Sequence, residues 1–267
     1  MDFSRALIDT SGYDRAGFAA SYDRHRPRPP DELLDTLCRY ARVERPRLVV
    51  DLGCGTGLST RAWAGRAERA VGVDPNPAML AAAEPARGVE YRQAYAQETG
   101  LEDACADVVT CSQSLHWMEP EPTLAEAARL LRPGGVFAAY DYDWPPLVDP
   151  EVDAAFDAYQ ARRGALRERY AILRGGDRWR KQDHLGRMQA SGHFRFCREI
   201  LFHSVEEGDA ERLVGFAYSI GLPVLDVGDE QIERELRIDE LEETARRRLG
   251  ERTVPFVFGY RVRIGVR

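Results

Sequence analysis

Three glycines alternate with other residues directly after a short apolar run, in the segment Val49 to Gly57 (VVDLGCGTG). Glycine lets the backbone turn sharply and lets a ligand reach main-chain atoms that a Cβ would shield. A dinucleotide-binding loop has the spacing G-x-G-x-x-G, and its last position is Leu58 here. Asp51, two residues before the first glycine, would repel a pyrophosphate and attract an ammonium group. The loop therefore favours a ligand with an amino-acid moiety, and a nicotinamide dehydrogenase is the alternative.

A second carboxylate, Asp74, ends the next apolar run, Gly72-Val73-Asp74. A carboxylate at the tip of a second strand, about twenty residues past a glycine loop, can accept hydrogen bonds from both hydroxyls of a ribose. Together the loop and Asp74 indicate a nucleoside that carries an amino acid. The alternative is a turn aspartate before Pro75 that binds no ligand.

Apolar runs alternate with helical patterns between Val49 and Asp143, which predicts the elements that position these groups. The expected strands are RLVVDLG, AVGVD, YRQAY, ADVVTCSQS and GGVFAAYDYD. The expected helices are DELLDTLCRYARV, LSTRAWAGRA, PAMLAAAE and TLAEAARLL. Such alternation is typical of an α/β fold with an open, doubly wound parallel sheet, in which ligands bind at the carboxyl ends of the strands.

The alternation breaks after residue 150. Helices are expected over 151–173, 181–190, 209–220 and 230–249, with strands at FRFCREILFHS and at the closing TVPFVFGYRVRIGVR. The closing segment alternates apolar residues with others, as a half-buried strand does. No linker divides the chain, so we predict a single domain over residues 1–267, with the two late strands extending the same sheet.

Four successive segments, DLGCGTG, GVDPNPAML, YAQETGLEDACADVVTCSQSLHW and RLLRPGGVFAAYD, resemble the motifs of the class I S-adenosylmethionine-dependent methyltransferases. The likeness is to the small-molecule branch, with ubiquinone/menaquinone-type and trans-aconitate-type enzymes, and it covers about residues 14–143. It implies a seven-stranded, mostly parallel sheet with an antiparallel last strand. In that arrangement 31–143 would bind the cofactor. Residues 1–30 and a helical cap insertion, 151–191, would cover the acceptor site, and 192–267 would supply the last two strands and helices.

The resemblance also implies the residues that bind S-adenosyl-L-methionine. The methionine part would be surrounded by Asp51, Gly53, Cys54 and Gly55, and the ribose would be held by Asp74. The ribose and adenine would be flanked by Pro75, Asn76, Met79, Tyr95, Ala96 and Gln97, with Ser112 to Ser114 beneath the sulfonium. Tyr22 would lie near the cofactor, and Arg26 would pair with its carboxylate. The alternative for Arg26 is a surface arginine in a proline-rich loop.

Methyl transfer from a sulfonium is an in-line displacement that requires alignment and desolvation but no metal. Aromatic faces near the sulfonium add cation–π attraction, and the candidates for the acceptor site are Tyr13, Trp117, Tyr140, Tyr142 and Trp144. The catalytic candidates are Tyr22 and His116. His116 would act as a general base if the acceptor is a hydroxyl or a protonated amine. Its alternative role is to hydrogen-bond the backbone and shape the pocket.

Composition limits the partners of this chain. The 267 residues carry a net charge of −7, so no global basic field favours nucleic acid or an anionic membrane, and no apolar run is long enough to span one. Five cysteines without a CxxC pair and without a histidine at metal-ligand spacing indicate reduced thiols in a cytoplasm and no metal site. We expect a cytoplasmic enzyme with a small-molecule acceptor. The alternatives are a non-catalytic protein that binds S-adenosylmethionine or S-adenosylhomocysteine, and a nicotinamide-dependent oxidoreductase.

Almost all basic residues of the chain are arginines. Of 37 lysines and arginines, Lys181 is the only lysine, which leaves 36 arginines. A GC-rich coding background explains such a bias, and selection for planar, bidentate anion-binding side chains is the alternative.

Overall fold

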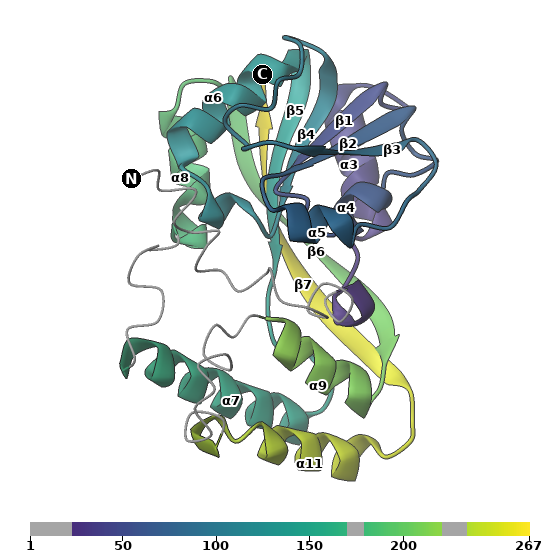
Figure 1. Cartoon of the computed structure of the whole chain (residues 1–267), viewed down its shortest axis with the longest axis vertical. Coiled ribbons are helices and arrows are strands. Elements are labelled where there is room, and N and C mark those ends of the chain that lie inside the picture. The colour runs from purple at the N-terminus through teal and green to yellow at the C-terminus, as the bar shows by residue number, and fades with distance from the viewer. Residues whose placement is uncertain (1–22, 170–178, 221–233) are drawn as a thin grey trace.

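A computed structural model describes residues 23–169, 179–220 and 234–267, and its centre is a seven-stranded sheet (Figure 1). The strand order is β3-β2-β1-β4-β5-β7-β6. The strands are β1 (Leu48–Leu52), β2 (Arg69–Asp74), β3 (Val89–Gln93), β4 (Ala106–Ser112), β5 (Leu131–Tyr142), β6 (Phe196–Gly208) and β7 (Val254–Val266). Strands β1 to β5 pair in parallel, and β7 runs antiparallel between β5 and β6. The predicted α/β sheet with an antiparallel last strand is confirmed.

Short helices precede β1 or lie between the first five strands. They are α3 (Asp31–Ala41), α4 (Leu58–Arg61), α5 (Pro77–Ala81), η1 (Leu115–Trp117) and α6 (Pro120–Leu130). In α3 two acidic residues occupy the first turn, where they complement the helix dipole, and three leucines form its buried face. The helix predicted for LSTRAWAGRA is shorter than expected, because after Arg61 the backbone continues through tighter i→i−3 hydrogen bonds, such as Trp63 N–H to Thr60 O at 3.1 Å.

Three longer helices, α7 (Pro150–Arg169), α9 (Ala210–Ser219) and α11 (Ile238–Leu249), pack together as a helical lobe beside the extended ends of β6 and β7 (Figure 1). They come from two segments of the chain, since α7 precedes β6 and the other two lie between β6 and β7. The predicted cap insertion, residues 151–191, is therefore not one structural unit. Its first half joins this lobe, whereas η2 (Lys181–Asp183) leads into α8 (His184–Ala190), which packs on β6.

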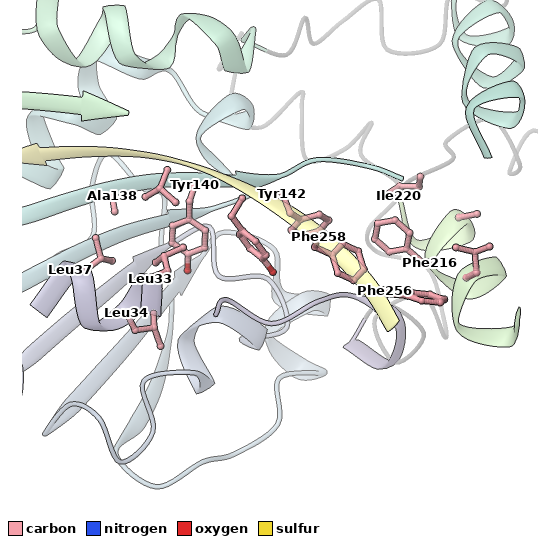
Figure 2. Packing of buried hydrophobic residues seen from close by; sticks show 14 of the residues in the cluster. Leu33, Leu34, Leu37, Ala138, Tyr140, Tyr142, Phe216, Ile220, Phe256 and Phe258 are labelled. Atoms are coloured by element: carbon pink, nitrogen blue, oxygen red, sulfur yellow. The ribbon is translucent and has the colours of Figure 1, made fainter. Parts of the chain in front are cut away.

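One hydrophobic cluster connects the sheet with the helical lobe. It begins where Leu33 and Leu37 of α3 pack near Tyr140, and it continues through Tyr142 to Phe258 of β7 (Figure 2). The rings of Phe258 and Phe216, which belongs to α9, are 5.7 Å apart between centroids. The lobe is thus built onto the same core as the nucleotide-binding half of the sheet. None of the helices in the described ranges is long and apolar enough to cross a membrane.

Candidate active site

A cleft opens at the carboxyl ends of β1, β2 and β4, where the sequence predicts ligand binding. Most of the predicted site residues line it: Arg26, Gly53, Cys54, Gly55, Asp74, Pro75, Asn76, Met79, Tyr95, Ala96, Gln97, Ser112, Trp117 and Tyr142. These residues lie far apart in the chain, and the parallel strands bring them to one edge of the sheet. No group of three or more histidine, cysteine or acidic side chains that could hold a metal occurs in the described part of the chain.

The glycine loop has the backbone conformation that its sequence indicates. Gly53 and Gly55 have φ angles of 70° and 56°, in the left-handed region that other residues rarely adopt. A Cβ on Gly53 would lie 2.7 Å from the Cβ of Ser114, closer than real contacts allow. The amides of Gly53 and Cys54 donate to the Val73 carbonyl at 2.7 and 3.1 Å, which ties the loop to β2. The loop therefore presents bare backbone to the cleft at a fixed position.

Asp74 is the carboxylate of the cleft, at the tip of β2. One oxygen accepts the Gly55 amide and the other accepts the Asn76 amide, both at 2.8 Å. Burial raises the pKa of Asp74 to about 6, and these two hydrogen bonds oppose that rise. Each carboxylate oxygen has more than one lone pair, so both keep the capacity to accept a further hydroxyl. This arrangement suits a ligand with two adjacent hydroxyl donors.

Asp51 lies beneath the glycine loop rather than in the cleft lining. It is 1% exposed, and its carboxylate accepts hydrogen bonds from the hydroxyls of Ser59, Thr60 and Thr110. Burial raises its pKa despite these three donors. The structure thus gives Asp51 a role in shaping the turn between β1 and α4, and the direct attraction of an ammonium group stays a prediction.

A flatter, less polar part of the cleft adjoins Asp74. Asn76 caps α5, because its side-chain oxygen accepts the amides of Ala78 and Met79 at 2.9 and 3.3 Å. That cap fixes Met79, whose thioether is a polarizable surface suited to an aromatic base. Ala96 completes this side of the cleft after β3.

Arg26 and Tyr142 contact each other at the opposite side of the cleft. The Arg26 guanidinium donates to the Tyr142 hydroxyl at 2.8 Å and to Oγ and the carbonyl oxygen of Ser219 at 3.2 and 2.5 Å. Arg26 is buried, so it is not the exposed loop arginine of the alternative interpretation. It joins the segment before α3 to β5 and α9, and its pairing with a ligand carboxylate stays a prediction.

Several predicted residues lie elsewhere. Tyr140 is 1% exposed in the hydrophobic core and does not line the cleft, because α3 packs directly over it (Figure 2). His116 is buried behind the lining, with Nδ1 3.9 Å from Oδ1 of Asp141, and Trp144 lies in a neighbouring depression with Asp141. Tyr13 and Tyr22 lie outside the described residues.

Sequence reasoning missed five lining residues, Pro27, Pro29, Leu58, Ser59 and Met118, and the cleft also contains Gln113 and Ser114. The prolines follow Arg26 directly, and Leu58 and Ser59 follow the last glycine of the loop. Their proximity to predicted site residues is the signal that could have found them. Met118 follows η1, and nothing in its local pattern distinguishes it from a core methionine.

Comparison with known proteins agrees with this geometry. Residues 50–139 match a family described as a methyltransferase domain. A solved structure from Anaeromyxobacter dehalogenans, assigned as a type II methyltransferase, superposes with a TM-score of 0.67 at 27% identity and covers 90% of this chain and 97% of that one. Residues 50–139 are therefore similar to a methyltransferase domain, and the chain has the fold of the class I S-adenosylmethionine-dependent methyltransferases.

Two curated relatives are each 39% identical to this protein over part of the chain. An uncharacterized methyltransferase of Mycobacterium tuberculosis matches over 116 residues, 43% of this chain and 46% of the relative. A trans-aconitate 2-methyltransferase of Methylobacterium radiotolerans matches over 125 residues, 44% and 45% of the two chains. The chain thus spans less than half the length of the curated relatives it matches. A phosphoethanolamine N-methyltransferase of Haemonchus contortus shares the fold, with a TM-score of 0.55 at 16% identity.

Proposed function

We propose that the cleft binds S-adenosyl-L-methionine and that the protein transfers its methyl group to a small organic acceptor. The observation that carries this proposal is the position of Asp74, whose two oxygens are held by the Gly55 and Asn76 amides beside the glycine loop. Asp74 would accept both ribose hydroxyls, the glycine loop would lie along the methionine part, and Met79 would cover the adenine.

The proposed position of the cofactor also distinguishes the two ends of the cleft. With the adenosine at Asp74 and the methionine part at Gly53 to Gly55, the sulfonium would face Ser112 to Ser114. The acceptor would then enter at the end lined by Gln113, Trp117 and Tyr142. The aromatic faces there attract a sulfonium cation without competing as nucleophiles. Catalysis would rest on in-line alignment and exclusion of water.

The acceptor class follows from the kind of cleft and from one relative. The cleft is lined mostly by small and apolar side chains with a few polar groups, as small-molecule sites are. The relative from Methylobacterium radiotolerans is named for trans-aconitate, a small organic acid. His116 and Tyr22 stay proposed as catalytic residues, with His116 as the base for an acceptor that must lose a proton. All five cysteines are free thiols, which supports a cytoplasmic location.

Calorimetry followed by an acceptor panel tests the proposal. The wild-type protein should bind S-adenosylmethionine and S-adenosylhomocysteine and should not bind NAD. Methyl transfer from isotopically labelled cofactor to at least one small acceptor should then be detected. Tight NAD binding without S-adenosylmethionine binding would identify an oxidoreductase. Cofactor binding without transfer to any acceptor would favour a non-catalytic binding protein.

A further inference from the structure

The only lysine of the chain lies at the acceptor end of the cleft. Lys181 begins η2, and its Nζ donates to Oε1 of Gln113 at 2.5 Å and lies 2.9 Å from Oδ1 of Asp141. The ammonium is also 5.9 Å from the centre of the Trp144 ring. Lys181 therefore contacts Gln113, the residue that follows β4, and Asp141, near the carboxyl end of β5.

Gln113 is the member of this group that lines the cleft. Its backbone has a φ of 52°, a conformation that non-glycine residues seldom adopt and that occurs preferentially at functional sites. The amide N–H donates to the Tyr140 carbonyl at 2.9 Å, and the side-chain Nε2 donates to the Tyr142 carbonyl at 3.1 Å. An ammonium only donates hydrogen bonds, so the amide oxygen and not the NH₂ group must face Lys181. Lys181 and the Tyr142 carbonyl together thus determine which way the Gln113 amide is oriented.

Asp141 is the anchor on the β5 side. It is buried, and its second oxygen accepts Nη1 of Arg263 at 2.7 Å, so the carboxylate is balanced by two cations. A separate backbone contact, from Trp179 N–H to the His116 carbonyl at 3.0 Å, holds the same part of the insertion to η1. Residues 179–183 are consequently held across the ends of β4 and β5 at two points.

We propose that Lys181 is a positioning residue for the acceptor, because it fixes the Gln113 amide and holds the insertion against the open end of the cleft. This inference rests on the proposed function. Since the other 36 basic residues of the chain are arginines, the presence of a lysine at position 181 is informative. A compact ammonium can direct separate protons at an amide oxygen and a carboxylate without keeping them in one plane, whereas the N–H groups of a guanidinium are fixed in a planar fork.

The contacts can be tested without an acceptor, by nuclear magnetic resonance. Protein labelled with ¹⁵N-lysine contains one labelled side chain, and an ammonium gives a sharp signal only where hydrogen bonds slow its exchange with water. We expect one signal, in the free protein and with S-adenosylhomocysteine, that broadens beyond detection in Gln113→Ala. A wild-type ammonium that exchanges as fast as free lysine would overturn the inference. Lys181→Arg should remove the signal and confirms its assignment.

Kinetics with an acceptor found in the panel tests the role itself. Lys181→Gln should raise the acceptor KM about tenfold or more, since small displacements of a positioned group are costly, with a smaller change in kcat and cofactor affinity within about twofold. Lys181→Arg should recover part of the loss. In a double-mutant cycle Gln113→Ala should add little to Lys181→Gln, because both remove the same contact.

The matched control is Arg169→Gln, which removes an exposed charge of the same insertion that pairs with Glu235, and it should leave both parameters unchanged. An unchanged acceptor KM in Lys181→Gln, with wild-type cofactor binding, would overturn the inference and leave the proposed function intact. Absence of cofactor binding in the wild-type protein would instead refute the proposed function. The two failures are therefore distinguishable.

Discussion

We expect recognition of a nucleoside by the cleft to depend mainly on Asp74. Hydrogen bonds to a charged group contribute about 1.5–3 kcal/mol each, and the proposed site offers two of them to the ribose. We therefore expect Asp74→Ala to weaken S-adenosylmethionine binding by about 2–4 kcal/mol, measured by calorimetry. Asp103→Ala is the control, because Asp103 is exposed and pairs with Arg129 outside the cleft lining. Equal affinity of the Asp74 variant and the wild type would refute the ribose role.

The protonation of Asp74 gives the same residue a pH dependence. Burial raises its pKa to about 6 in the free protein, and ribose hydroxyls that donate to the carboxylate would lower it in the complex. Below pH 6 the free site is protonated, so binding must release a proton there. Affinity should be constant above about pH 7 and fall as the pH drops through 6, approaching about tenfold per pH unit.

Calorimetry in buffers of different ionisation enthalpy measures the released proton directly. Asp74→Asn should bind weakly with an affinity that does not change over the same range. A wild-type affinity that stays flat between pH 5 and 7 would show that Asp74 does not meet the ligand.

At the scale of elements, Arg26 joins three parts of the fold that are distant in sequence. Arg26→Met would leave the Ser219 carbonyl and the Tyr142 hydroxyl without their buried donor. Unsatisfied buried groups cost about 1–3 kcal/mol each, so we expect the free energy of unfolding to fall by about 2–4 kcal/mol in urea titrations. Arg24→Met is the control, because its ion pair with Glu211 is 70% exposed on both sides, and it should change stability by less than about 1 kcal/mol. Equal effects of the two substitutions would contradict the structural role of Arg26.

The elements themselves could be predicted from sequence because their signals are local. The glycine loop and the apolar strands are recognised within a few residues, and the resemblance to a known family supplied the number of strands and the antiparallel direction of the last one. The packing partners of the helices could not be predicted, since a helical pattern shows that one face is buried but not against what. For this reason the sequence did not show that α7 and α8, predicted as one cap insertion, separate, with α7 packing on α11 in the helical lobe and α8 on β6.

The wrong prediction for Tyr140 and the unforeseen hydrogen bonds of Asp51 have the same origin, and a direct contact of Asp51 with a ligand stays a prediction. Tyr140 and Tyr142 share one face of β5, as alternate residues of a strand do, and only the later one extends beyond α3 into the cleft. Asp51 has the sequence position of a ligand contact. Three hydroxyls that the fold brings together, including Thr110 of the neighbouring strand β4, already satisfy it. Such saturation depends on tertiary contacts, which no local pattern shows.

At the scale of the whole molecule, the shared hydrophobic cluster determines how the protein unfolds. The helical lobe contributes Phe156 and Phe216 to a cluster that also contains Leu33 of α3 and Val49 of β1. Between them lies β7, whose Phe258 contacts the rings of both Tyr142 and Phe216. The buried residues of the lobe belong to the same cluster as those of the sheet, so the lobe should not remain folded once the sheet unfolds.

Phe258→Ala tests this cooperativity. Truncating a fully buried phenylalanine costs about 3–5 kcal/mol, so the unfolding midpoint should drop sharply in urea. The transition should stay single, with tryptophan fluorescence and far-ultraviolet circular dichroism coinciding, because Phe258 touches both halves. S-adenosylhomocysteine at a hundred times its dissociation constant should return about 2.7 kcal/mol to the variant, and both signals should shift together. Two separate transitions, with only one moved by the ligand, would mean that the lobe and the sheet fold independently and that cofactor binding is felt by the sheet alone.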